Sequence, residues 1–397
     1  MRLGRDFNTE AFWAGITAFV WYAFGAVPLH IGVSQQLGIS TAETSSWIFI
    51  VWFGGAVSSI CLSIHFRQPI PVTWTIPGLI YLGTLAGQYS FAELLGANLI
   101  AGILMTVLGA LGIGRHIMKW LPLPIVMGMF GGSILGYVIR LVQATVDDLA
   151  VAGVAVAGYL VGRFIGSSRI PPIGLAVAFG AVAIWTGPET ASASVSWDLP
   201  TIGMPPMSFS LSAVLAVALP MVVLAMGLGN VQGLGFLMAQ GYHVPINRIS
   251  TIVGINSIVN ALFGGHPATI ARTGVAILAS ADAGPADRRY WANLVASVCT
   301  IGMALAAVPL ASLLGILPPT YIYALAGLAI LTSFQDAMEK AFASKLRFGA
   351  VVAFGGAATP FVFAGITSAF WAVLLGVAAS LLAERKSLVA YWREQSD

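Results

Sequence analysis

Long apolar runs are the feature of this sequence that most limits its fold. Several reach the roughly 20 residues that a helix needs to cross the hydrocarbon core of a bilayer, namely 11–33, 45–64, 91–113, 210–238 and 361–383. Only 8% of the residues are charged, whereas a soluble domain carries about 25%. A chain so poor in charge cannot cover a water-facing surface with polar groups. We therefore predict an all-α integral membrane protein.

About fourteen apolar segments follow one another, and two of them are short. We place them at 11–33, 45–64, 76–88, 91–113, 121–140, 148–163, 171–186, 210–240, 248–264, 270–281, 290–312, 317–333, 347–359 and 361–383. With the N-terminus in the cytoplasm, all of the 18 Lys and Arg residues except Arg140 and Arg272 fall in cytoplasmic loops and tails. Cytoplasmic loops carry such an excess of basic residues. We expect a multi-pass protein of the inner (cytoplasmic) membrane with both termini in the cytoplasm.

A short internal repeat relates the third and tenth segments. The stretch PVTWTIPGLIYLG from Pro71 and the stretch PATIARTGVAILA from Pro267 share Pro, Thr, Gly and Leu at the same positions, about half a chain apart. Seven segments per half is an odd number, so the two halves must have opposite orientations in the bilayer. Inverted repeats with interrupted helices are typical of secondary transporters. We predict one repeat over 1–204 and a second over 205–397.

Both repeat stretches look like broken membrane spans. Pro69 and Pro71 prevent a helix before Trp74, and Thr75 followed by Pro77 is a typical helix start. The stretch 264–269 plays the same part in the second half. We expect an apolar half-helix of about 12 residues after each, because that length covers about half of the hydrocarbon core. Two such helices direct their partly positive N-termini at one another, which favours an anion.

Arg272 lies in the first turn of the second half-helix and is the one ionised side chain well inside the predicted spans. An isolated charge at that depth costs several kcal/mol (about 3 or more), so it needs a partner or a function. We interpret it as the counter-charge of an anionic substrate. The alternatives are a structural ion pair and a side chain that reaches the membrane surface. We assign Asp336, Glu339 and Lys340 to a solvated inner loop, which leaves Arg272 without an acidic neighbour inside a span.

The candidate substrate-binding residues lie at the two helix breaks and in the eighth segment. Asn230 and Gln232, in a Gly-rich part of the eighth segment, either line a polar cavity or form hydrogen bonds between helices. Trp74 either stacks on an aromatic ligand or packs in the core. His266 is the candidate for proton coupling because imidazole titrates near neutral pH; its alternative role is a structural hydrogen bond. The full set is Thr73, Trp74, Thr75, Asn230, Gln232, His266, Thr269, Arg272 and Thr273.

The sequence contains no nucleotide-binding Gly-rich loop, no metal-ligand cluster and no nucleophile–base pair. We therefore expect no enzymatic activity, no cofactor and no bound metal. The net charge of +3 comes from the predicted cytoplasmic loops and does not indicate a nucleic-acid partner. The expected partners are a small anion, a proton as the coupling ion and the lipid bilayer.

Several motifs taken together resemble the benzoate/proton symporter family, usually called BenE. The clearest are RQPI from Arg67, WTIPG from Trp74, FGGH from Phe263, DRRYWA from Asp287 and GITSAFW from Gly365. The resemblance covers most of the chain. It implies the fold of the uracil transporter and sulfate permease superfamily, with a core domain of about 1–120 plus 205–312 and a gate domain of about 121–204 plus 313–397. It also implies a homodimer, a substrate held between half-helices three and ten, and elevator-like movement of the core.

Two stretches depart from the BenE pattern inside the expected site. Where the family usually has Ser-Gln-Asn in segment eight, this chain has Leu228-Gly229-Asn230, and the stretch 263–273 looks more like the sulfate permease family. The leading hypothesis is proton-coupled symport of benzoate or a related organic carboxylate. The alternative is a transporter or channel for an inorganic anion such as bicarbonate, sulfate or chloride. A nucleobase carrier is disfavoured, because the stretch 210–240 lacks the carboxylate that binds the base in that group.

Overall fold

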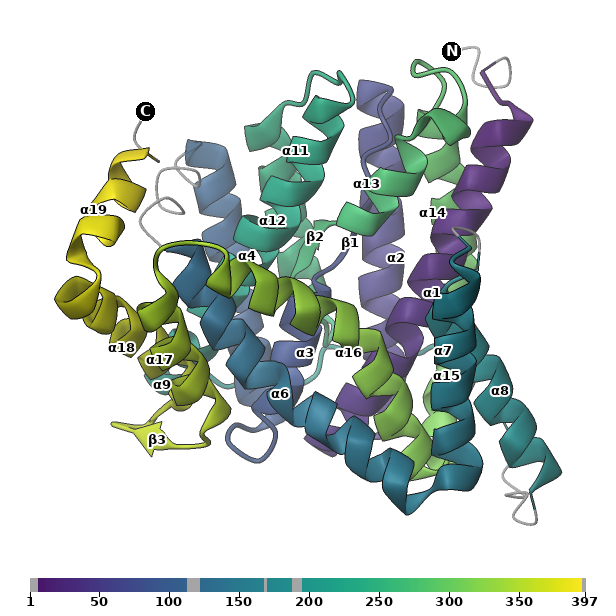
Figure 1. The fold of residues 1–397 in the computed structure, drawn as a ribbon. Helices are drawn as coiled ribbons and strands as arrows, with labels where there is room; N and C mark the ends of the chain where they lie inside the picture. The colour runs from purple at the N-terminus through teal and green to yellow at the C-terminus, as the bar shows by residue number, and fades with distance from the viewer. Residues whose placement is uncertain (1–5, 113–121, 168–169, 188–194, 395–397) are drawn as a thin grey trace.

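The computed structural model describes residues 6–112, 122–167, 170–187 and 195–394. A helix occupies part of every predicted segment (Figure 1). The first half contains α1 (Thr9–Leu37), α2 (Thr41–Phe66), β1 (Val72–Trp74), α3 (Ile76–Thr84), α4 (Phe91–Leu111), α6 (Leu123–Asp147), η2 (Leu149–Gly153), α7 (Val154–Ile165) and α8 (Pro172–Thr186). Five basic residues of the predicted cytoplasmic set lie outside the described residues: Arg2, Arg5, Arg115, Lys119 and Arg169.

The second half begins with one long, irregular helical run made of α9 (Leu211–Ala213), η3 (Val214–Ala218), α10 (Leu219–Val222), η4 (Val223–Asn230) and α11 (Val231–Ala239). It continues through α12 (Ile246–Leu262), β2 (Ala268–Ile270), α13 (Arg272–Leu278), η5 (Ala281–Ala283), α14 (Tyr290–Leu305), α15 (Ala307–Ser312), η6 (Leu313–Gly315) and α16 (Pro319–Phe342). It ends with α17 (Arg347–Ala358), β3 (Val362–Phe363), β4 (Ile366–Thr367), α18 (Ser368–Ala383) and α19 (Arg385–Glu394).

Five of the described helices are long and apolar enough to cross a bilayer: α1, α2, α4, α6 and the run Leu211–Ala239. The stretch Tyr290–Gly315 makes a sixth if its two parts, bent by 58°, count as one span. The prediction of a helical multi-pass membrane protein is therefore confirmed. The total of fourteen membrane segments stays a prediction, since the other helices are shorter or less apolar.

The helix breaks form where the prolines require them. Pro69 and Pro71 precede β1, and the Thr75 side chain accepts a hydrogen bond from the Gly78 N–H at 3.2 Å to cap α3. β1 and β2 then pair as an antiparallel two-stranded sheet with Thr73 opposite Thr269. Pairing satisfies the backbone N–H and C=O groups that an extended segment would otherwise leave unpaired inside a membrane protein. The two repeat stretches thus stabilise one another.

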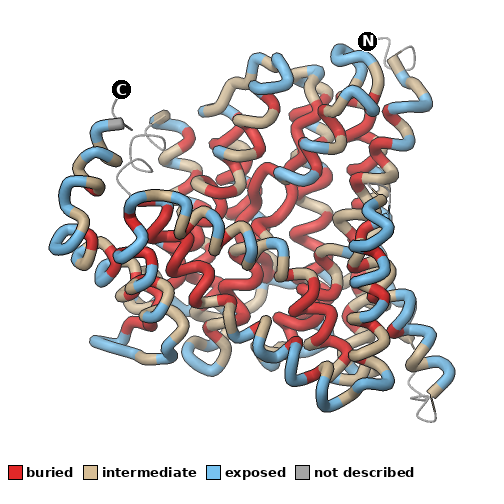
Figure 2. Tube along the Cα trace, viewed as in Figure 1, coloured by how far each residue is buried: buried red, intermediate tan, exposed pale blue. Residues whose placement is uncertain are grey.

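Helices of the two halves are interleaved rather than separate. α2 packs on α14, α4 packs on α12, and α6 packs on both α16 and α17. α7 pairs with α8, and α17 with α18, at opposite sides of the view in Figure 1. Burial is densest in the middle, where β1 and β2 meet, and lowest on the outer helices (Figure 2). The two strands therefore lie at the centre of the molecule.

The predicted bounds of four elements, α3, α13, α16 and α18, are wrong. The half-helices are shorter than expected, with nine residues in α3 and seven in α13. α18 begins only at Ser368, because the preceding residues form the β3–β4 hairpin. α16 runs on to Phe342, so Asp336, Glu339 and Lys340 lie on a helix and not in an inner loop. The hydrophobic pattern predicts too early an end for α16 because the last turns of this helix are polar.

Candidate functional site

A cavity of about 350 Å³ lies beside the paired strands. Residues of α1, the two repeat stretches and the η4–α11 run form one wall, and residues of α6, α7, α8 and α16 form the other. Six of the nine predicted site residues line it: Thr73, Trp74, Gln232, Thr269, Arg272 and Thr273. Thr75, Asn230 and His266 lie behind this wall. The strand pairing therefore brings candidates from distant parts of the chain to one cavity.

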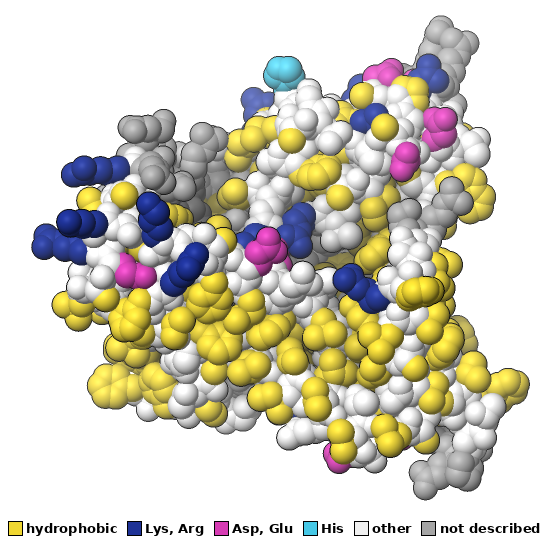
Figure 3. All heavy atoms as spheres, viewed as in Figure 1, with side chains coloured by type: hydrophobic (Ala, Val, Ile, Leu, Met, Phe, Trp, Pro, Cys, Tyr) yellow, Lys and Arg dark blue, Asp and Glu magenta, His cyan; other side chains and the backbone are white. Residues whose placement is uncertain are grey.

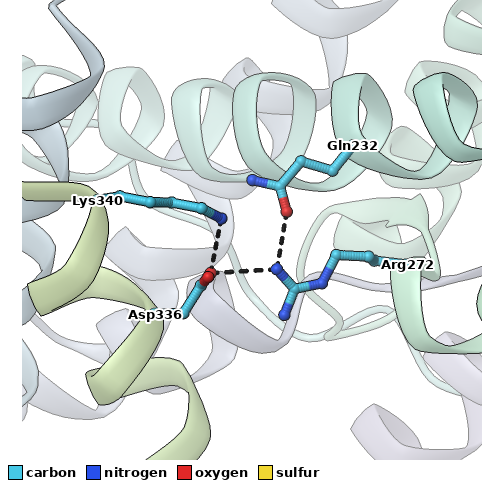
Figure 4. Close-up of polar contacts among 4 residues, drawn as sticks. All are labelled: Gln232, Arg272, Asp336 and Lys340. Carbon is cyan, nitrogen blue, oxygen red and sulfur yellow. Dashed lines mark hydrogen bonds and ion pairs between the residues drawn. The ribbon is translucent and has the colours of Figure 1, made fainter. Parts of the chain in front are cut away.

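Arg272 is held at the cavity wall by two neighbours (Figure 4). Its Nη1 donates to Gln232 Oε1 at 2.9 Å and to Asp336 Oδ2 at 3.1 Å. Lys340 Nζ donates to the same Asp336 oxygen at 2.8 Å. The interpretation that Asp336 and Lys340 form a solvated charge run is therefore wrong, because Asp336 lines the cavity and pairs with Arg272. The sequence separation of the two residues concealed this contact.

The charged residues of the cavity leave it electropositive. Arg163 at the end of α7 lines it together with Arg272, and Asp336 is the one acidic residue among the described lining residues. Arg272 keeps 49% of its side chain exposed, so solvent reaches the site. Such a site attracts a small anion.

The rest of the cavity is largely aromatic and apolar. Trp21, Tyr22 and Trp74 line the strand side, and Phe130 and Tyr159 line the opposite side. The Tyr22 hydroxyl and the Trp74 indole Nε1 are buried and have no hydrogen-bond partner among the described residues. A buried donor without a partner costs about 1–3 kcal/mol, so both groups favour a ligand with acceptor atoms.

The two half-helix N-termini differ. In α3, Thr75 caps the Gly78 N–H, and Pro77 has no N–H to offer. In α13, Ala271 provides no side-chain cap, so the first N–H groups are not capped by the preceding residue. Of the two half-helix N-termini, that of α13 therefore has more backbone donors without a side-chain cap.

A π-helix packs against β2 in the same wall of the cavity. η4 ends at Asn230, whose Oδ1 accepts the Ile270 N–H at 2.9 Å. The Thr269 hydroxyl lies against Gly229, where an added Cβ would come within 1.7 Å of Oγ1. Wide π-turns are frequent at functional sites. The Gly-rich sequence predicts this irregularity, and the structure confirms it. Asn230 positions β2 from behind the cavity.

Trp74 reaches the cavity while its ring packs inward. The ring centroid lies 4.4 Å from that of Trp52 and 5.4 Å from that of His30. Only 3% of the residue is exposed. Trp74 therefore packs in the core, as one of its two predicted roles requires, and it also borders the cavity.

His266 is fully buried behind the strands. Its Nδ1 accepts the Trp47 Nε1–H at 2.8 Å, and its Nε2 has no hydrogen-bond partner among the described residues. The ring centroid of His30 lies 5.8 Å away. Because Nδ1 accepts, a neutral His266 carries its proton on Nε2. The ring therefore lies one layer away from the cavity.

Sequence reasoning missed the wall formed by the predicted gate. Arg163, Tyr159 and Phe130 carry no local signal, because each sits in an ordinary helical pattern. Asp336 could have been found as an acidic residue near the end of an apolar segment. Among the described residues, no three His, Cys, Asp or Glu side chains come together as a metal site would need.

Sequence comparison finds relatives along nearly the whole chain. The family model described as "Benzoate membrane transport protein" (BenE) matches residues 5–382. The chain is 27% identical to inner membrane protein YdcO of Escherichia coli, covering 88% of this chain and 90% of that protein. It is 25% identical to the benzoate membrane transport protein of Acinetobacter baylyi, covering 95% and 96% of the two chains.

Structural comparison finds the same fold in anion transporters. The transmembrane domain of the cyanobacterial bicarbonate transporter BicA aligns with a TM-score of 0.53 at 15% identity, covering 96% of this chain and 97% of that one. The inward-facing murine anion transporter Slc26a9 aligns with a TM-score of 0.60 at 14% identity, covering 96% of this chain and 69% of that one. At such identities the likeness concerns the fold alone.

Proposed function

The chain is a membrane transporter of the benzoate membrane transport protein (BenE) family, as its motifs predict, and we propose that it carries benzoate or a related organic carboxylate in symport with protons. The proposal rests chiefly on one observation: a single cavity combines the Arg272 guanidinium with aromatic walls. A carboxylate binds well to a guanidinium. A ring packs well on Trp, Tyr and Phe side chains.

The predicted anion chemistry fits the geometry around Arg272. Only Nη1 of the guanidinium is engaged by described residues, so its other N–H groups are available to a substrate carboxylate. The uncapped start of α13 adds backbone donors beside it. The cavity of about 350 Å³ reaches the roughly 300 Å³ at which small-molecule sites begin. A single-ring carboxylate suits both its size and its chemistry.

We further propose that the cavity lies between a moving core and a static gate. The proposed core contributes α1, both repeat stretches and the η4–α11 run, and the proposed gate contributes α6, α7, α8 and α16. Strand pairing supports this division, since Thr75 N–H donates to Pro267 O and Ala271 N–H donates to Pro71 O, which links the two repeat stretches into one body. In an elevator mechanism this body carries the anion along the gate. A homodimer joined through the gate domains would hold the gate in place.

Orientation in the membrane is part of the same proposal. The start of α1 and the end of α19 lie on the same side of the molecule (Figure 1). Most charged side chains on the face in Figure 3 gather toward that side, and hydrophobic side chains cover much of the remainder. By the positive-inside rule that side faces the cytoplasm. The cavity, bordered by Arg163 and Asp336, then opens inward in this conformation.

His266 remains the candidate for proton coupling. Protonation at Nδ1 would replace an acceptor by a donor and so expel the Trp47 N–H. A proton on this buried ring would therefore repack the layer between α2 and β2 behind Trp74. The packing of His30 and Trp74 in the same layer supports a link between that ring and the cavity.

Uptake into proteoliposomes tests the function. Purified protein is offered benzoate, bicarbonate, sulfate and chloride, with and without an inward proton gradient. We expect benzoate uptake that the gradient stimulates, and near-complete loss with Arg272→Ala. Arg248→Ala, which removes an exposed charge outside the cavity, serves as the matched control. Normal transport by Arg272→Ala would refute the counter-charge role, and no uptake of any anion would refute the function.

The second candidate is transport of an inorganic anion. The observation that favours it is the fold shared with the bicarbonate transporter BicA and the anion transporter Slc26a9. A bicarbonate or chloride ion needs the electropositive wall but not the aromatic one. Uptake of bicarbonate with no uptake of benzoate would decide for this candidate.

A further inference from the structure

Asp336 shares one carboxylate oxygen between two cations on different elements. Oδ2 accepts from Arg272 on α13 at 3.1 Å and from Lys340, one turn along α16, at 2.8 Å. Of the ion pairs among the described residues, Arg272–Asp336 alone joins α13 to α16. This contact crosses the cavity and links its two walls (Figure 4).

We propose that Asp336 is an internal competitor of the transported anion: a carboxylate bound to Arg272 drives Asp336 onto Lys340 and breaks the link between α13 and α16. This inference rests on the anion site proposed above. It assigns Asp336 and Lys340 a role in substrate affinity, in addition to the binding role of Arg272.

Charge balance supports this exchange, in which Asp336 leaves Arg272 for Lys340 when an anion binds. Arg272 carries one positive charge, and Asp336 already neutralises it in this structure. A second carboxylate on the remaining guanidinium edge would face Asp336 across a few ångströms, and like charges at that distance repel. Lys340 offers Asp336 a second partner on its own helix, so Asp336 can leave Arg272 and stay paired. Arg163, the other lining cation, faces the cavity from α7 and is available to the anion.

Partial exposure keeps the free energy lost on breaking the Arg272–Asp336 pair small. The side chains of Arg272, Asp336 and Lys340 are 49%, 29% and 27% exposed. Exposed ion pairs contribute little to stability, so the loss of one opposes substrate binding only weakly. The ion pair can thus hold the empty cavity together and yield to an anion. By reciprocity, whatever weakens the Arg272–Asp336 pair strengthens anion binding.

Equilibrium binding to purified protein tests the proposal, with benzoate, bicarbonate and sulfate as probes in isothermal titration calorimetry. Asp336→Asn should lower the dissociation constant of at least one probe about two- to fivefold. Lys340→Met should raise it by a similar factor, because Asp336 then has only Arg272. In proteoliposomes the same changes should appear in KM more than in kcat.

The double variant separates exchange from plain electrostatics. In Asp336→Asn/Lys340→Met the dissociation constant should equal that of Asp336→Asn, because Lys340 acts only through Asp336. Glu339→Gln is the matched control, since it removes an exposed acid three residues from Asp336 and next to Lys340 and should leave binding unchanged. The proposal is overturned if Glu339→Gln tightens binding as much as Asp336→Asn, or if Lys340→Met weakens binding equally in both backgrounds.

The remaining outcomes distinguish this inference from the proposed function. Tighter binding by Asp336→Asn of an anion other than benzoate, with no benzoate uptake by the wild type, refutes benzoate transport and upholds the exchange. Normal benzoate uptake with unchanged affinity in Asp336→Asn refutes the exchange alone. If Asp336→Asn does not fold, Lys340→Met is compared with Lys345→Met, which removes an exposed charge outside the cavity. An unchanged dissociation constant in Lys340→Met then overturns the proposal.

Discussion

Thr73 lies directly opposite Thr269 at the centre of the β1–β2 ladder. The internal repeat makes these two residues equivalent, so each half presents the same residue to the other. The flanking hydrogen bonds repeat this relation, with Thr75 N–H donating to Pro267 O at 3.0 Å and Ala271 N–H donating to Pro71 O at 2.9 Å. Exchanging the halves exchanges the two bonds. A local two-fold axis therefore passes between the threonines, and the predicted inverted repeat would have such an axis.

Gly229→Ala should destabilise the protein and abolish transport. Its Cβ would lie 1.7 Å from Thr269 Oγ1 and 2.8 Å from Thr269 Cβ, so β2 must shift away from η4. Overpacking of this kind costs about 1–3 kcal/mol. Thermal unfolding in detergent and uptake in proteoliposomes measure the two effects. Gly235→Ala is the control, because nothing lies within 4 Å of its added Cβ. Equal stability and equal uptake in the two variants would contradict the close approach of Gly229 to Thr269.

Asn230→Leu should lower the stability of β2 by removing its side-chain acceptor. Asn230 is 2% exposed, and its Oδ1 accepts the Ile270 N–H. Leaving that buried N–H unpaired costs about 1–3 kcal/mol. Chemical unfolding followed by tryptophan fluorescence provides the measurement. Gln240→Ala, at the exposed end of α11, should be neutral, and wild-type stability of Asn230→Leu would remove the positioning role of Asn230.

Trp74→Leu should weaken benzoate binding about two- to tenfold, because an aromatic pair contributes about 0.5–1.5 kcal/mol. Bicarbonate, which has no ring, should lose less than about twofold on the same scale. Competition binding with both anions makes the comparison. Trp197→Leu controls for the substitution at an 82% exposed position. Equal losses for both anions would indicate that Trp74 serves packing alone.

His266→Gln should uncouple transport from the proton gradient. Gln can still accept the Trp47 N–H but cannot carry a proton near neutral pH. Stimulation of uptake by an inward proton gradient should therefore vanish, while exchange of labelled for unlabelled benzoate continues. His243→Gln, at an exposed loop position, should behave as the wild type. Loss of exchange together with the gradient effect would instead assign His266 a structural role.

The helix breaks and the membrane class could be read from local sequence. Proline removes a backbone donor and disfavours the helical conformation of the residue before it. Two prolines one residue apart, at Pro69 and Pro71, therefore favour an extended stretch before Trp74. Apolar runs and basic loops predict spans and sides for the same local reason. Seven of the nine candidate residues adjoin these breaks, and Asn230 and Gln232 lie in the Gly-rich eighth segment. Six of the nine line the cavity.

The second wall of the cavity could not be read in this way. Arg163 and Asp336 face the repeat stretches only because the fold places α7 and α16 at the other wall of the same cavity. A residue's distance along the chain carries no information on that packing. The C-terminal end of α16 could not be predicted either, since a polar last turn looks like a loop when its tertiary partners are unknown.

The amino-acid sequence by itself determined that the chain is a membrane protein, that two related stretches break their helices, and that Arg272 stands at one of these breaks. Each follows from hydrophobicity, proline stereochemistry or charge, which act locally. Only the tertiary structure decided that Arg272 is paired and that Asp336, 64 residues away, is its partner. That relation depends on how the fold places α16 across the cavity from α13, whereas the Asp336–Lys340 pair follows from their spacing of four residues along α16.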